Sequence, residues 1–226
     1  VMRRFPLPAR RGGRAAGPGG ERRWGDGSEI PRLILVIDTS SALSALALLD
    51  RSRQVVREAT YPSGRSFDLP ARFRDLAEGE AVTKVAVATG PGSFTGLRVG
   101  VSFGLGLAIG LRIPIVPLPT LGIQAARSDQ PSTAVSEAGR GRVYYLVPGG
   151  KPALGEPNEI PKTHWLVGFV SPAVDSGLRD AGHRFRPEKE LRSFGEAAAL
   201  LMEMANEVAY GSLRLEYMQS FSAPRT

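Results

Sequence analysis

The chain has 226 residues, of which 42% are hydrophobic and 23% charged, a composition typical of a globular protein. It has no cysteine, which excludes disulfides and thiolate metal centres. Its two histidines, His164 and His183, lack the spacing of a zinc-binding pair. We therefore expect no metal site.

The net charge of +7 is concentrated at the N-terminus, because residues 1–32 hold eight arginines against three acidic residues. That segment carries +5, which leaves +2 for all the rest. Its Arg, Gly and Pro content cannot bury enough surface to fold. We expect residues 1–32 to be a disordered extension, or one absent from the mature protein, rather than a nucleic-acid-binding arm.

No secretory signal is apparent in this segment. The longest apolar run, Val99 to Leu111, is shorter than the ~18 residues that cross a bilayer. We expect a cytoplasmic protein with no membrane partner.

The elements expected in the first half alternate in a way that indicates fold class. In chain order we expect strands at 32–40, 43–50 and 54–61, a helix at 66–78, a strand at 84–90, a helix at about 95–111, a strand at 113–118 and a helix at 120–127. Short turns join the first three strands, so they must run antiparallel. The order is that of the ribonuclease-H-like core, the α/β unit duplicated in actin-like kinases and Hsp70 ATPases.

The second half is expected to be a reduced copy of this core. It should contain strands at 132–138, 141–147 and 163–170, a loop at 148–162 and helices at 173–181 and 194–209. Ser193 and Glu196 match a capping box for the last helix. A boundary near residues 128–131 would divide an N-terminal domain, 33–128, from a C-terminal domain, 129–226.

The block "GPGSFTGLR", residues 90–98, follows a strand and opens a helix, so it is a candidate phosphate cradle. It lacks the Lys-Ser/Thr ending of a P-loop, and the next strand lacks the acid of a dinucleotide site. An anion could still bind at the helix start beside Arg98. From these residues alone, simple capping by Ser93 or Thr95 is the better explanation.

Asp38, in "IDTS", is the other polar candidate. An aspartate at the end of a first strand can hold magnesium or orient a phosphate. The kinase-type loop has a glycine after the aspartate, which is absent here, and no second phosphate loop follows. Asp38 is therefore expected to organise the turn, and we expect no cofactor.

The helix after the loop carries glycines every four residues, at Gly96, Gly100 and Gly104. Glycine inside a helix costs about 0.5–1 kcal/mol relative to alanine, so close approach of another element is expected. The remaining faces are apolar and also need cover. The chain's own second half or a partner subunit could supply it.

Together, "ILVIDTSS" and "GPGSFTGLRVGVSFGLGLAIGLRIPIVPLPTL" closely resemble the tRNA threonylcarbamoyladenosine biosynthesis protein TsaB family. The resemblance implies a two-domain actin/Hsp70-ATPase-like α/β fold with a duplicated ribonuclease-H-like core. It also implies a non-catalytic partner of the ATPase-like subunit TsaD. With the ATPase TsaE, that complex transfers threonylcarbamoyl to N6 of adenosine 37 in tRNAs reading codons that begin with A.

The resemblance assigns the glycine-rich block to a subunit interface, with tRNA contacted through the complex. An uncovered apolar helix also predicts self-association of the free chain. The interface candidates are Gly92, Phe94, Gly96, Leu97, Arg98, Gly100, Phe103, Gly104 and Leu107. The alternative is an enzyme of the same fold, peptidase-like or an ATP-dependent phosphotransferase, that uses Asp38 with Ser93 or Thr95.

Overall fold

The computed structural model describes residues 2–4, 32–64 and 66–218, and the expectation of disorder for residues 1 and 5–31 lies outside the described residues. Within those ranges the larger sheet has six strands in the order β1-β4-β3-β2-β5-β6. Their bounds are β1 Met2–Arg4, β2 Leu33–Asp38, β3 Leu43–Leu49, β4 Val55–Pro62, β5 Val82–Ala88 and β6 Ile115–Leu118.

Strand directions in this sheet follow from the lengths of the connections. Strands β2, β3 and β4 are joined by short turns and pair antiparallel. Strands β5 and β6 each follow a helix and lie parallel to β2 and β5, respectively, because a parallel neighbour needs a long crossover. The arrangement confirms the ribonuclease-H-like order predicted for the first half, and the fold is actin/Hsp70-ATPase-like.

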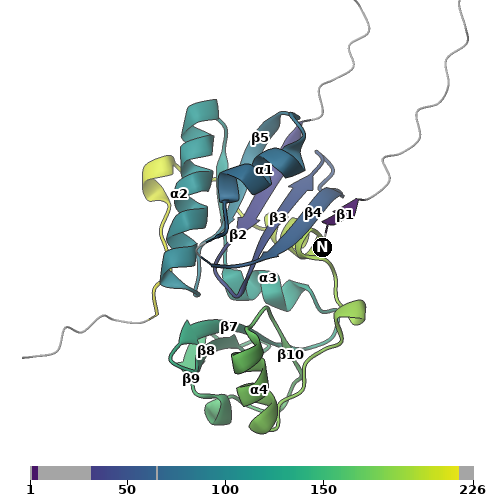
Figure 1. The fold of residues 1–226 in the computed structure, drawn as a ribbon, viewed down its shortest axis with the longest axis vertical. Coiled ribbons are helices and arrows are strands. Elements are labelled where there is room, and N and C mark those ends of the chain that lie inside the picture. The colour runs from purple at the N-terminus through teal and green to yellow at the C-terminus, as the bar shows by residue number, and fades with distance from the viewer. Residues whose placement is uncertain (1, 5–31, 65, 219–226) are drawn as a thin grey trace, which may run out of the picture.

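Helices cover both faces of the larger sheet (Figure 1). Helices α1 (Leu69–Ala77) and α2 (Phe94–Leu111) pack on one face, and α3 (Thr120–Ala126) and α5 (Phe194–Met202) on the other. Successive residues of β2 alternate between the two cores, as the period of two in a strand requires. The centre of the sheet is therefore buried on both sides.

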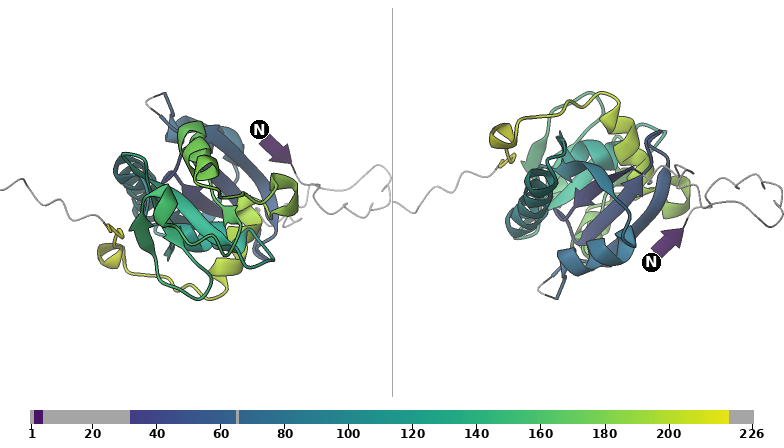
Figure 2. Two further views of the ribbon diagram at one scale, coloured as in Figure 1. Left: turned by 90° about the horizontal axis from the view of Figure 1, so that it is seen from below. Right: turned by 90° about the horizontal axis from the view of Figure 1, so that it is seen from above.

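The second sheet has the order β10-β7-β8-β9 among the described residues. Its elements are β7 Thr133–Gly139, β8 Arg142–Leu146, β9 Ala153–Gly155, β10 Leu166–Val167 and helix α4 Pro172–Asp180. Short 3-10 turns occupy Pro157–Glu159, Glu188–Glu190 and Tyr210–Ser212. Helix α3 lies between the two sheets, because Leu121 packs with Ala134 of β7, and Figure 2 shows the two lobes from both ends.

Several bounds differ from those predicted. Residues 148–162 were expected to be loop but contain β9, which pairs with β8. The helix expected over 194–209 ends at Met202, and the strand expected over 163–170 is confined to Leu166–Val167.

The C-terminal part of the chain leaves the smaller lobe and returns to the larger one. Helix α5 packs in the core beneath β3, and Leu213 and Leu215 pack against the core beneath α2. Residues 129–226 therefore do not fold as one unit apart from the larger sheet, although the second sheet does begin just after the predicted boundary. Met2–Arg4 also pair with β4, a contact that the sequence did not predict.

Candidate functional site

The glycine-rich block folds tightly against the end of β2. The Ser93 amide donates to the Ser40 carbonyl at 2.7 Å, and the Ser93 hydroxyl accepts from the Gly96 amide at 3.2 Å. A Cβ on Gly92 would lie 2.6 Å from the Ser40 carbonyl oxygen. Ser93 is thus the N-cap of α2, and Gly92 is needed so that the loop can touch the strand end.

The row of glycines on α2 faces the chain's own sheet. A Cβ on Gly96 would overlap the carbonyl oxygen of Thr39, and one on Gly104 would overlap Val87. The Thr39 hydroxyl donates to the Gly96 carbonyl at 2.6 Å, and Gly100 sits against the same threonine. The expectation that this row meets a partner is corrected, because it is what lets α2 lie close to β2 and β5.

The opposite side of α2 is open, and we call Val99, Ser102, Gly106, Ile109 and Gly110 the outer face. Val99 is 43% exposed and Ile109 is 50% exposed. No atom lies within 4 Å of a Cβ built on Gly106 or Gly110. Only 28% of the residues of α2 are buried, so a mostly apolar helix leaves one side uncovered in the described chain.

The predicted interface residues divide between these two sides. Leu97, Gly100 and Gly104 are buried, whereas Phe103 and Leu107 are partly covered by the core under α1. Phe94 and Arg98, at the start of the helix, are exposed. Of the predicted set, only Phe94 and Arg98, near the N-terminus of α2, are exposed, and the sequence singled out no residue of the outer face as an interface candidate.

Helix α2 is also long enough, and apolar enough, to cross a membrane by length and composition alone. This corrects the expectation of an apolar run that is too short. A core helix of a soluble protein meets the same criterion, and the inward glycine row packs α2 on the sheet in that way.

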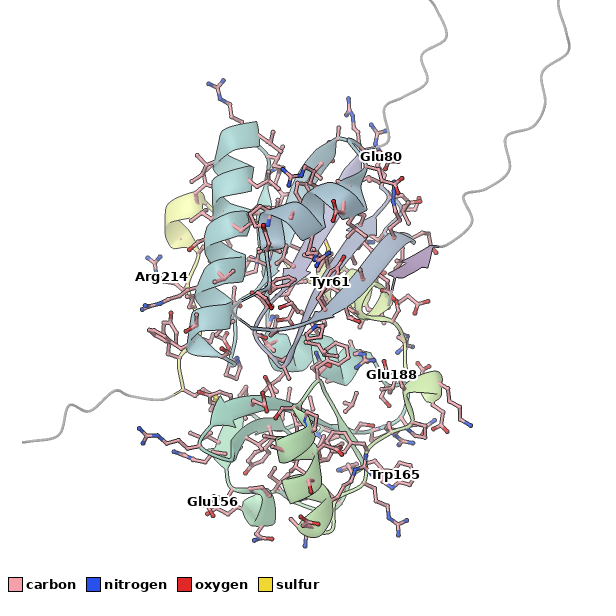
Figure 3. The ribbon with its side chains drawn as sticks, viewed as in Figure 1. Tyr61, Glu80, Glu156, Trp165, Glu188 and Arg214 are labelled. Carbon is pink, nitrogen blue, oxygen red and sulfur yellow. The ribbon has the colours of Figure 1, made fainter. Side chains whose placement is uncertain are left out.

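The last described residues, 210–218, run along α2, and we call this segment the C-terminal strap. The Arg98 guanidinium lies 3.7 Å from the centre of the Phe94 ring, and its Nε donates to the Tyr217 hydroxyl at 3.3 Å. At the other end of the helix the Tyr210 hydroxyl donates to the Ile113 carbonyl at 3.0 Å. In Figure 3 this strap passes beside α2, with Arg214 pointing outward.

A cleft of about 470 Å³ opens beside the start of α2, between the two lobes. One wall is the loop Gly92–Thr95, and the other is the β7–β8 hairpin with Arg140 at its tip. Tyr144 and Tyr217 complete the lining together with α4. The sequence left an anion at the helix start as an alternative to simple capping and did not point to the hairpin, because the two segments are far apart in the chain and only the tertiary fold brings them together.

Asp38 is almost completely buried, at 1% exposure. Its Oδ1 accepts from the Ser40 amide at 2.8 Å and from the Ser40 hydroxyl at 2.5 Å, while Oδ2 has no partner. Burial raises the pKa of this carboxyl, and the two hydrogen bonds from Ser40 oppose the rise. The nearby cavity is lined by Thr39, Ser41 and Ser93 and not by Asp38. This geometry fits the predicted role in the turn.

Comparison with known proteins connects this geometry to a family. A family model described as "TsaD: tRNA N6-adenosine threonylcarbamoyltransferase" matches residues 77–156. A tRNA threonylcarbamoyladenosine biosynthesis protein TsaB from Bacillus subtilis is 36% identical over 123 residues, which are 49% of this chain and 52% of that protein. The TsaB protein from Haemophilus influenzae is 34% identical over 97 residues, which are 41% of each chain. The chain thus spans about half the length of the curated relatives that it matches.

Solved structures agree on the fold. YeaZ from Pseudomonas aeruginosa aligns with a TM-score of 0.62 at 20% identity, covering 83% of this chain and all of that one. A second structure, described as having similarity to peptidase YeaZ from the same organism, aligns with a TM-score of 0.61 at 22% identity and equal coverage. The chain is thus similar in sequence to TsaB proteins over about half of their length, and it shares its fold with YeaZ.

Proposed function

We propose that this chain is a non-catalytic, cytoplasmic subunit in tRNA threonylcarbamoyladenosine biosynthesis. It supports a TsaD-type enzyme, assisted by a TsaE-type ATPase, that transfers threonylcarbamoyl to N6 of adenosine 37 in tRNAs reading codons that begin with A. The relatives named TsaB support the pathway, and tRNA is contacted through the complex.

The uncovered outer face of α2 is the observation that carries this proposal. Exposed apolar surface of this extent on a soluble domain marks an interaction site. Gly106 and Gly110 recur four residues apart on that face, so a second helix can approach the α2 backbone closely. The partner we assign to this face is a helix of the TsaD-type subunit, and in its absence a second copy of this chain through a two-fold contact.

The enzymatic alternative finds less support in the geometry. The Asp38 carboxyl is buried, and one of its oxygens is held by Ser40, so a phosphate or metal could reach it only after the strand end rearranged. The purified chain should therefore neither hydrolyse ATP nor modify tRNA on its own. ATP turnover that Asp38→Ala abolishes would favour the enzymatic alternative.

Substituting Gly106 by leucine tests the interface. The new side chain enters open space, so the fold should be retained while close helix approach is blocked. Binding to the TsaD-type partner should weaken tenfold or more, about 1.4 kcal/mol. Gly177→Leu in α4 is the matched control, because it too is a helical glycine with no atom nearer than 4.0 Å to an added Cβ.

Calorimetry with the partner and light scattering of the free chain provide the measurements. Wild type and Gly177→Leu should bind the partner equally, and the free wild type should self-associate while Gly106→Leu is monomeric. Unchanged partner affinity in Gly106→Leu would show that the outer face is not the interface.

A further inference from the structure

The cleft between the start of α2 and the β7–β8 hairpin combines groups that suit an anion. Helix α2 has 18 residues and no acidic residue in its first turn, so its N-terminal partial positive charge is not neutralised locally. The Thr95 amide belongs to that first turn, and neither it nor the Thr95 hydroxyl hydrogen-bonds to any described residue. Thr95 itself lines the cleft.

A second and independent observation comes from the opposite wall. Tyr144 is only 5% exposed, and its ring packs with Leu121 and Ala134 in the core between the lobes. Its hydroxyl has no hydrogen-bond partner among the described residues, yet the residue lines the cleft. Desolvation raises the pKa of this phenol, so the hydroxyl keeps its proton at neutral pH. The hydroxyl is not enclosed, so a ligand in the cleft can accept its hydrogen bond in place of solvent.

The β7–β8 hairpin supplies a positively charged side chain to the cleft. Arg140 stands at the hairpin tip, lines the cleft and makes no ion pair with a described residue. The only acidic side chain in the lining is Glu137. Its Oε1 accepts hydrogen bonds from the amide of Ser171, at 3.1 Å, and from the Ser171 hydroxyl. Glu137 is therefore held at the start of α4, where it keeps its negative charge, and Arg140 is the cation of the cleft lining.

We propose that this cleft binds the phosphate group of a small organic phosphate. The phosphate oxygens accept from the Thr95 amide, the Tyr144 hydroxyl and the Arg140 guanidinium, and the aromatic rings of Phe94 and Tyr217 border the remainder of the ligand. A volume of about 470 Å³ is within the usual range for small-molecule sites. The ring-rich lining favours a ligand with a planar group, such as a nucleoside monophosphate.

Isothermal titration of the whole chain with AMP, adenosine and inorganic phosphate tests the proposal. AMP should bind and adenosine should not, because the site recognises the anion, and inorganic phosphate should compete with AMP. Arg140→Gln should weaken AMP binding roughly tenfold or more, since it removes a charge-assisted hydrogen bond. Arg142→Gln is the matched control, because Arg142 lies on the same hairpin but outside the cleft lining.

Arg142→Gln should change the affinity by no more than about twofold, the effect of one screened surface charge. Tyr144→Phe keeps the ring in the core and removes only the hydroxyl, so it should weaken AMP without lowering the melting temperature. Equal losses in Arg140→Gln and Arg142→Gln, or tight binding of adenosine, would overturn the site. Binding of a short RNA that depends on Arg140, with no binding of AMP or phosphate, would replace it with an RNA-backbone contact.

Discussion

Alanine placed at Gly96 and at Gly106 should have opposite effects on the stability of the fold. Both glycines lie inside α2, so each substitution gains about 1 kcal/mol of helix propensity. At Gly106 nothing lies within 4 Å of the added methyl group, and the whole gain is retained. For a chain of this length, about 1 kcal/mol corresponds to a rise of about 2–4 °C in melting temperature.

The methyl group at Gly96 meets backbone rather than a flexible side chain. It would overlap the Thr39 carbonyl oxygen, so α2 or the end of β2 must shift, at an overpacking cost of about 3 kcal/mol. The shift also disturbs the hydrogen bond from the Thr39 hydroxyl to the Gly96 carbonyl, 2.6 Å long, worth about 1 kcal/mol. Subtracting the propensity gain leaves a net loss of about 3 kcal/mol, or about 6–12 °C.

Thermal unfolding followed by circular dichroism, with urea unfolding as a check on reversibility, gives both values from the same preparation. The informative quantity is the difference between the two variants, since propensity contributes equally to each. If Gly96→Ala were as stable as Gly106→Ala, the glycine row would not be the surface by which α2 docks, and the assignment of inner and outer faces would be wrong.

Three further predictions concern other parts of the chain. Burial raises the pKa of Asp38, so its ionisation costs stability as the pH rises above 3.8 through the folded-state pKa; Asp38→Asn should remove that part of the pH dependence in urea unfolding. Ser193→Ala removes the hydroxyl that caps α5 and should cost about 1 kcal/mol, whereas Ser102→Ala on the outer face should not destabilise. Deleting residues 1–31 removes only β1 among the described elements, so the melting temperature should change little; a fall of many degrees would show that the pairing of Met2–Arg4 with β4 contributes substantially to stability.

The larger sheet could be predicted because its local signals agree with one another. Short turns forced the first strands to be antiparallel, and the helix expected over 66–78 has local start signals, because Asp68 accepts from the Ala71 amide at 3.0 Å and Pro70 lies in the first turn. Ser193 and Glu196 likewise form the predicted capping box. In these places local chemistry and tertiary packing favour the same structure.

Other features depended on contacts that no local pattern encodes. β9 has three residues and exists because β8 offers it an edge, which a Pro- and Gly-rich segment does not reveal. The direction of the glycine row was also ambiguous, since α2 has apolar residues or glycines on every side. Only the docked helix shows that Gly100 and Gly104 face the sheet and that Gly106 faces outward.

The two proposed surfaces meet at the first turn of α2, and this has a thermodynamic consequence. Phe94 lines the cleft and is also exposed at the end of the helix where the outer face begins, and Arg98 links its ring to Tyr217 of the C-terminal strap. A phosphate that orders Thr95 and Phe94 would therefore alter the surface offered to a partner on α2. Linkage requires the partner to change phosphate affinity by the same factor as phosphate changes partner affinity. A factor other than one that Phe94→Ala abolishes would identify this turn as the coupling element, whereas two independent affinities would mean that the turn is already rigid in the free chain.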